Sequence, residues 1–126
     1  RYTTVGGIPI TQLIPEDRIE AISARTASGG GEIVKLLERG SAFYAPGSAA
    51  AIMAESVLND RRRVIPASCY LTGQYGLDDV YIGVPCIIGA NGVEQMFELD
   101  LTDSELESLQ GSANFYKGQL KDILGY

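Results

Sequence analysis

The chain has 126 residues, of which 45% are hydrophobic and 21% charged, and its formal net charge is -6. This size and balance are typical of a single globular domain with a modest core. The net charge disfavours non-specific binding to nucleic acid or to anionic lipid, and no apolar run approaches the roughly 18 residues that a transmembrane helix needs. We therefore expect a protein with neither nucleic-acid nor membrane partners.

The N-terminal third of the sequence predicts a short strand and a long interrupted helix. Residues 1–5 have the composition of a strand, and the two glycines that follow predict a turn. A helix is expected to begin near Pro15, because proline is tolerated at the first helical position and the two acidic residues after it favour the positive helix end. Gly29–Gly31 interrupt the helical spacing, which then resumes until Gly40 provides a stop.

A second helix is expected from Ala49 to Asn59, after an irregular link over Ser41–Pro46. The apolar face of this helix is rich in alanine and is therefore small and flat. Such a face suits close packing of one helix on another, either inside one subunit or between two.

The second half of the sequence predicts an antiparallel meander of three strands. Pro66 suggests that the first strand either lies at an edge or starts irregularly, because proline cannot donate a ladder hydrogen bond. Residues 72–78 predict a turn, and Asn91-Gly92 predicts a type I′ hairpin turn, because both residues tolerate positive φ. The expected strands are Val64–Leu71, Val80–Ile88 and Val93–Leu101.

A final helix should follow the strands, since Thr102-Asp103-Ser104-Glu105 has the pattern of a capping box. The order of the expected elements, helices followed by strands and then a helix, predicts an α+β fold rather than alternating βαβ units. No linker divides the sequence, so one domain over residues 1–126 is the simplest account.

The two cysteines, Cys69 and Cys86, lie inside apolar strand patterns without a metal-ligand partner nearby in the sequence. We expect buried reduced thiols, although a disulfide between neighbouring strands is possible. Reduced thiols are typical of a cytoplasmic protein.

Other candidate sites each have a simpler structural interpretation. Gly29–Gly31 lack both the Walker pattern and the dinucleotide fingerprint, so a helix kink or a close contact is favoured over a phosphate cradle. Arg61–Arg63 favour a solvated helix end or a subunit contact over an anion site. Asp78-Asp79 are expected in a turn, and the tyrosines are expected to pack in strands. The chain has no histidine, which excludes a Ser-His hydrolase and a His-liganded metal site on this chain. No catalytic residue and no metal ligand can be assigned.

Five ordered segments resemble the malate/lactate family of 2-hydroxy-acid dehydrogenases, most closely the bacterial malate dehydrogenases that are similar to lactate dehydrogenases. The similarity covers essentially the whole chain. The segments are Arg1–Gly7 with Pro9, Gly40–Pro46, Gly73–Gly76, Gly83–Pro85 and Gly89–Glu94.

The resemblance implies that the chain is the C-terminal substrate-domain portion of an NAD-dependent malate dehydrogenase of the tricarboxylic acid cycle. It implies an N-terminal Rossmann domain, absent from this chain, that binds NAD, and a catalytic histidine upstream of Arg1. Ala42 resembles the small residue that faces the substrate, and Pro46 resembles the apolar residue that packs against the nicotinamide ring. The intact enzyme would interconvert malate and oxaloacetate by hydride transfer, as a homodimer or homotetramer, and this chain alone would be inactive.

Two alternatives stay open from the sequence. One is an L-lactate dehydrogenase of the same family, because the specificity loop is not among these residues. The other is a noncatalytic association module that uses the alanine-rich helix face.

Overall fold

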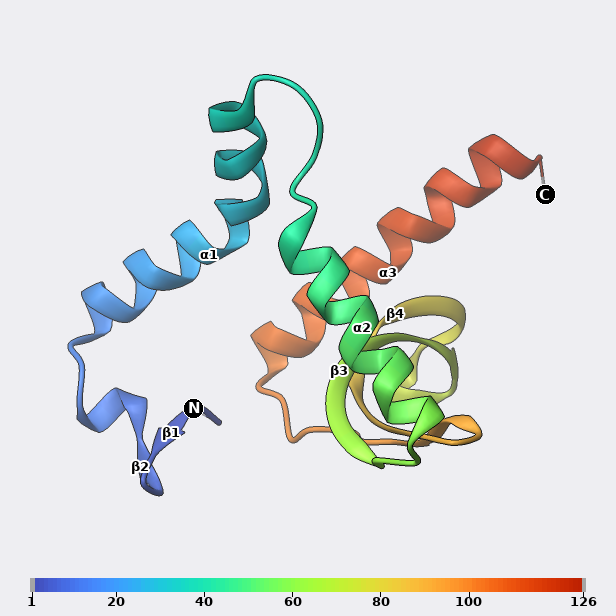
Figure 1. Ribbon diagram of the computed structural model, residues 1–126, viewed down its shortest axis with the longest axis horizontal. Coiled ribbons are helices and arrows are strands. Elements are labelled where there is room, and N and C mark those ends of the chain that lie inside the picture. Colours follow the sequence, from blue (N-terminus) through green and yellow to red (C-terminus); the bar gives the residue numbers. More distant parts are fainter. Residues whose placement is uncertain (1, 126) are drawn as a thin grey trace. The chain divides into compact units, whose positions relative to one another are not determined.

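A tight hairpin opens the described part of the chain, which in the computed structural model runs from residue 2 to residue 125 (Figure 1). Strands β1 (Thr4–Val5) and β2 (Ile8–Pro9) pair antiparallel. Gly6 and Gly7 form the turn with φ values of 57° and 85°, a left-handed pair that glycine adopts without strain. A short 3-10 helix, η1 (Ile10–Gln12), leads to the first long helix.

Helix α1 runs from Glu16 to Leu37, with Pro15 at its N-cap as the sequence predicts. It continues through Gly29–Gly31, and its ribbon changes direction part-way along (Figure 1). Apart from the adjacent residues and the backbone of the helix itself, a Cβ atom built on any of the three glycines would meet no described atom within 4 Å. A kink, rather than close packing within this chain, is therefore the role that the structure gives to the glycines.

The second helix begins earlier than expected. Helix α2 runs from Tyr44 to Leu58, and the backbone N–H of Gly47 donates to the carbonyl oxygen of Phe43 at 2.9 Å. Pro46 therefore lies in the first turn, where backbone N–H groups have no partner inside the helix, and it does not delay the helix start. The chain divides into two compact units after Ser48, inside this helix.

The second unit contains the predicted three-stranded antiparallel sheet in the order β3-β4-β5. Its strands are β3 (Arg63–Thr72), β4 (Asp78–Gly89) and β5 (Gly92–Met96), and the 3-10 helix η2 (Gln74–Gly76) joins the first two. Pro66 lies on the edge strand β3, opposite Pro85, as expected. The core is formed by alternate residues of β3 and β4 with parts of η2 and α3, namely Cys69, Leu71, Tyr75, Leu77, Val80, Ile82, Val84, Cys86, Ile88 and Ala113.

Two details of the hairpin between β4 and β5 differ from the expectation. Only Gly92 has a positive φ, of 84°, and the register shifts between Ile87 and Ile88, so the turn is followed by a bulge and is not type I′. Strand β5 also ends at Met96 rather than at Leu101. Beyond it, the N–H of Phe97 still donates to the carbonyl oxygen of Pro85 in β4, but the Phe97 carbonyl and the Leu99 N–H are bound by the Tyr75 hydroxyl.

Helix α3 (Asp103–Leu124) begins with the predicted capping box. The Glu105 N–H donates to Thr102 Oγ1 at 3.3 Å, and the Thr102 N–H donates to Glu105 Oε2 at 2.7 Å. Ala113 is buried in the core, while Leu120 and Ile123 near the C-terminal end are 49% and 76% exposed. No helix within residues 2–125 combines the length and the apolarity that a membrane crossing requires.

Candidate functional site

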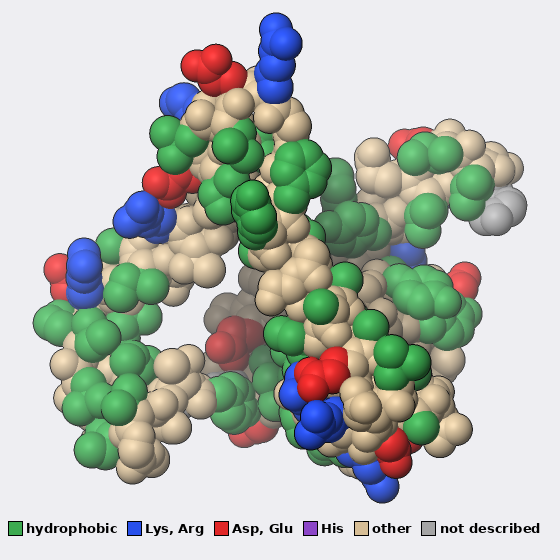
Figure 2. Space-filling view, viewed as in Figure 1, with side chains coloured by type: hydrophobic (Ala, Val, Ile, Leu, Met, Phe, Trp, Pro, Cys, Tyr) green, Lys and Arg blue, Asp and Glu red, His purple; other side chains and the backbone are tan. Residues whose placement is uncertain are grey.

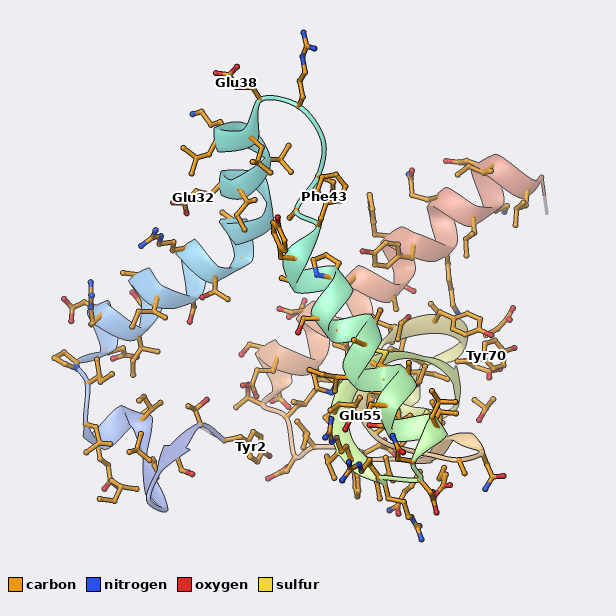
Figure 3. The ribbon with its side chains drawn as sticks, viewed as in Figure 1. Tyr2, Glu32, Glu38, Phe43, Glu55 and Tyr70 are labelled. Carbon is orange, nitrogen blue, oxygen red and sulfur yellow. The ribbon has the colours of Figure 1, made fainter. Side chains whose placement is uncertain are left out.

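The segment from Gly40 to Gly47 is the candidate pocket wall, and local chemistry fixes its shape. Helix α1 ends at Leu37, its C-cap residue Glu38 has a φ of 60°, and Gly40 has a φ of 96°. The positive φ favours glycine there, and a Cβ atom on Gly40 would also lie only 3.0 Å from Cε2 of Phe43, so the ring would have to shift slightly to admit a side chain. Figure 3 labels Phe43 in this segment.

The structure places Ala42 and Pro46 on this one segment, four residues apart. Ala42 is half-buried just before α2, and Pro46 is exposed in the first turn of α2. Neither residue can donate or accept a proton through its side chain. From Gly40 to Ser48 the only ionisable side chain is that of Tyr44, which is 93% exposed. The segment can therefore form an apolar wall, but it supplies no acid, base or nucleophile.

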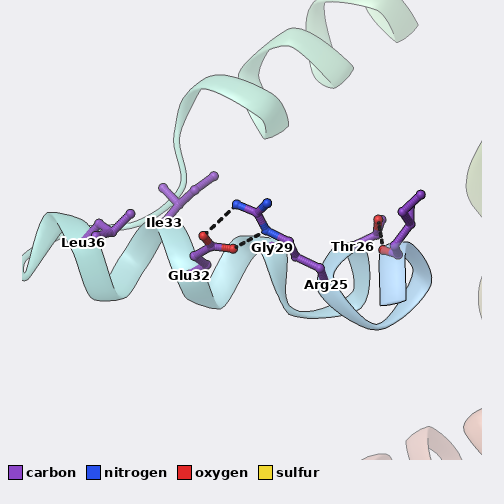
Figure 4. A pocket seen from close by; sticks show the side chains of 7 residues that line it. Arg25, Thr26, Gly29, Glu32, Ile33 and Leu36 are labelled. Atoms are coloured by element: carbon purple, nitrogen blue, oxygen red, sulfur yellow. Dashed lines mark hydrogen bonds and ion pairs between the residues drawn. The ribbon is translucent and has the colours of Figure 1, made fainter. Parts of the chain in front are cut away.

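A second feature of the first unit, a groove along the bend of α1, was not predicted from the sequence (Figure 4). Its volume is about 460 Å³, and its apolar lining comes from Ile22, Ile33 and Leu36. Arg25 and Glu32 close one side, with Arg25 Nη2 3.0 Å from Glu32 Oε1 and Arg25 Nε 3.2 Å from Glu32 Oε2.

This ion pair shifts both pKa values in the direction that favours the charged forms. The hydrogen bond and the charge of Glu32 raise the pKa of Arg25, and the same contact with Arg25 lowers the pKa of Glu32. Both side chains are well exposed, so solvent screens the pair. The two residues are seven positions apart, whereas neighbouring side chains on a helix are three or four positions apart, so the sequence does not predict this pair.

The arginine cluster Arg61–Arg63 is engaged in ion pairs within the second unit. Glu55, which Figure 3 labels, binds Arg61 at 3.2 Å and Arg63 at 2.9 Å. Glu94 binds Arg62 at 3.0 Å. These pairs support the structural interpretation of the cluster over an anion site.

Asp78-Asp79 depart from the expected turn and form the start of β4. Asp79 has a φ of 51° and accepts a 2.9 Å hydrogen bond from the Tyr70 hydroxyl. A register shift between Leu71 and Thr72 produces this irregular start, and no local sequence signal predicts it.

Both cysteines are buried free thiols, as expected. Burial, with a further contribution from Cys86, raises the pKa of Cys69 to about 11. Such a thiol is a poor nucleophile. Within residues 2–125 no three acidic, cysteine or histidine side chains gather in a way that could hold a metal ion.

Comparison with known proteins assigns the chain to a family. The family model described as lactate/malate dehydrogenase, alpha/beta C-terminal domain, matches residues 2–125. The chain belongs to the lactate/malate dehydrogenase family. Within this family it is 61% identical over 114 residues to the malate dehydrogenase of Thermomicrobium roseum, a match that covers 90% of the chain and 37% of the relative. It is 50% identical over 124 residues to the malate dehydrogenase of Bacillus israeli, with 98% and 40% covered.

Solved structures of lactate/malate dehydrogenases show the same fold. The malate dehydrogenase of Salinibacter ruber superposes with a TM-score of 0.94 at 52% identity, covering 98% of this chain and 40% of that one. The lactate dehydrogenase of Eimeria maxima with NADH and oxamate gives a TM-score of 0.93 at 48% identity, covering 99% and 40%. The chain thus spans about two fifths of the length of these relatives and corresponds to their C-terminal portion.

Proposed function

We propose that this chain is the C-terminal substrate-domain portion of an NAD-dependent malate dehydrogenase that interconverts malate and oxaloacetate. The observation that carries the proposal is the match of residues 2–125 to the family's C-terminal domain, at 50–61% identity to the two malate dehydrogenases compared above. This sequence identity favours a whole protein that is a cytoplasmic, homo-oligomeric enzyme of the tricarboxylic acid cycle.

The residues of this chain would contribute walls rather than reacting groups. Ala42 would leave room for a dicarboxylate substrate, and Pro46 would pack against the nicotinamide ring and exclude water from the hydride path. A histidine acid–base group would have to come from outside this chain, since the chain has no histidine. The substrate domain would extend over residues 1–126, next to a Rossmann domain that these residues do not form.

The residues present do not fit the whole of NAD. All strand pairs within residues 2–125 are antiparallel, and none forms the strand–glycine-rich turn–helix unit that binds a dinucleotide. Pro46 could contact only the nicotinamide end. We therefore expect the isolated chain to be inactive.

The first unit also supports a role as part of a larger assembly. No side chain of α1 is buried, and Ile22, Val34, Leu36 and Leu37 are 40–77% exposed. Figure 2 shows hydrophobic side chains spread over the visible surface of this helix. Apolar side chains in such number are typical of a surface that another part of the protein covers.

A fusion of this chain to the N-terminal three fifths of the Thermomicrobium roseum enzyme tests the proposal. The fusion should oxidise NADH when oxaloacetate is supplied, whereas the 126-residue chain alone should not. Ala42→Leu in the fusion should lower kcat/KM for oxaloacetate by at least about tenfold by filling the substrate space, while the nearby Ser48→Ala should leave it unchanged. Turnover by the isolated chain, or a folded fusion that binds NADH but reduces no 2-oxo acid, would overturn the proposal.

A lactate dehydrogenase is the second candidate, supported by the likeness to the Eimeria maxima enzyme. A second fusion, to the N-terminal portion of that enzyme, addresses it. If the chain comes from a malate dehydrogenase, this fusion should reduce pyruvate less efficiently than the intact Eimeria enzyme does. Undiminished pyruvate reduction would favour the lactate assignment. A noncatalytic association module is the third candidate, and activity of either fusion would exclude it.

A further inference from the structure

A hollow between the C-terminal half of α3 and the start of β4 belongs to no part of the proposed dehydrogenase chemistry. Its volume is about 500 Å³, and every residue that lines it lies in the second unit. The walls are therefore built on the sheet and on the helix that packs against it, which are the elements that share the core.

One wall of the hollow is aromatic and the opposite wall is aliphatic. The rings of Tyr70 and Tyr81 lie 5.2 Å apart at an angle of 49°, a favourable tilted pair that fixes both side chains. Leu120 and Leu124 face the hollow from α3 and are 49% and 53% exposed. An apolar group could displace water from both walls.

The hollow also has charges of both signs on opposite sides. Lys117 and Lys121 lie one helical turn apart on α3, and no carboxylate within residues 2–125 pairs with either of them. Asp79 faces them from β4, with Oδ1 held by the Tyr70 hydroxyl at 2.9 Å. The hydrogen bond to Asp79 and the charge of Asp79 raise the pKa of Tyr70, which keeps the hydroxyl protonated as a donor, and Asp78 adds a second, smaller negative contribution on the strand side.

The backbone conformation at Asp79 is a second indication that the fold holds this carboxylate in a specific position. Its φ of 51° is uncommon for a residue other than glycine, and it occurs where the register between β3 and β4 shifts. Bulges re-aim side chains, and strained residues of this kind gather at binding sites. Here the result is a carboxylate that faces a hollow lined by two lysines, neither of which has a carboxylate partner in the described part of the chain.

We propose that this hollow binds a small zwitterion with an apolar body, of the α-amino acid class. The ligand carboxylate lies between Lys117 and Lys121, its ammonium group reaches Asp79, and its side chain packs against Tyr81 and Leu120. Asp79 would repel a ligand that carries only a negative charge, and the two lysines would repel a ligand that carries only a positive charge. Only a ligand with both charges matches both sides.

Three probes that share one aromatic body test the two charges separately. L-phenylalanine carries both groups, 3-phenylpropanoate carries only the carboxylate, and phenethylamine carries only the ammonium group. Titration of the full 126-residue chain, followed by NMR of backbone amides, should show shifts at residues 79–81 and 117–121 with L-phenylalanine. Each single-ended probe should bind at least about tenfold more weakly, a difference of about 1.4 kcal/mol.

Variants then assign the charges. Lys117→Gln with Lys121→Gln should weaken L-phenylalanine binding about tenfold, and so should Asp79→Asn, because asparagine tolerates the left-handed backbone and keeps an acceptor for Tyr70. Lys35→Gln on α1 is the matched control and should change nothing. Absence of shifts at these amides at millimolar L-phenylalanine, equal binding of either single-ended probe, or unchanged binding in the folded variants would overturn the proposal.

Discussion

The hydroxyl of Tyr75 holds the backbone of Leu99, whose N–H donates to it at 2.8 Å. The same hydroxyl donates to the carbonyl oxygen of Phe97 at 2.9 Å, so one side chain fixes the segment between β5 and α3. The Tyr75 backbone is held as well, because its N–H donates to Glu98 Oε2 at 2.7 Å and its carbonyl accepts from Gln110 Nε2 at 3.0 Å. These contacts stabilise a tyrosine whose φ is 56°.

Tyr75→Phe should lower the free energy of unfolding by about 2 kcal/mol, because it leaves the Leu99 N–H and the Phe97 carbonyl without their partner next to the core. Urea denaturation measures the change. Tyr81→Phe is the matched control and should lie within about 0.5 kcal/mol of the parent, since Tyr81 is 67% exposed. Equal effects of the two substitutions would show that the Tyr75 hydroxyl does not hold this segment.

Two glycines on strand β4 should respond in opposite ways to alanine. A Cβ atom on Gly89 would lie 2.5 Å from Oε1 of Glu94 and 2.8 Å from Oδ1 of Asp60, and Glu94 also pairs with Arg62. Gly89→Ala should therefore cost about 1–3 kcal/mol. Apart from its two chain neighbours, Gly83 has no atom within 4 Å of its Cβ position, so Gly83→Ala should be neutral or stabilise by about 0.5 kcal/mol. Denaturation of both variants provides the check, and a Gly89→Ala variant as stable as the parent would contradict the prediction.

The parts of this fold that the sequence predicts are those that neighbouring residues determine. The capping box at Thr102 and the edge position of Pro66 depend on a few adjacent residues, and both were confirmed. The predicted start of α2 at Ala49 was wrong, because the last residues assigned to the irregular link, Tyr44 to Pro46, form the first turn of the helix, where proline is tolerated.

The contacts that the sequence did not predict join residues that are distant along the chain or that a bend brings together. The Tyr75 hydroxyl reaches backbone groups 22 and 24 residues away. Arg25 contacts Glu32 seven residues further along α1, in the part of the helix that continues through its glycines. For the candidate site, Ala42 and Pro46 followed from family resemblance alone, since apolar walls carry no chemical pattern of their own.

Ser56→Ala should stabilise the chain. Its hydroxyl is fully buried in α2, and within residues 2–125 it has no hydrogen-bond partner. Removing an unsatisfied buried hydroxyl should raise the free energy of unfolding by about 1–2 kcal/mol, of which the better helix propensity of alanine supplies about 0.5 kcal/mol. Ser108→Ala, at an exposed position of α3, measures the propensity effect alone. A gain no larger at residue 56 than at residue 108 would indicate that the buried hydroxyl is hydrated or paired in solution.

The Cys69 thiol should make stability fall at alkaline pH. Its pKa is raised from 9.0 to about 11 in the folded chain, mainly by burial, so the folded state binds more protons than the unfolded state between these values. The contribution of this thiol is fully present below pH 9 and is lost as the pH rises through 11. The free energy of unfolding, measured from pH 8 to 11 by urea denaturation, should therefore decline less steeply in Cys69→Ala than in the parent.

The same burial should protect Cys69 from iodoacetamide until urea unfolds the chain. Rapid alkylation of the folded protein at neutral pH would show that the thiol is accessible to solvent and would contradict the prediction.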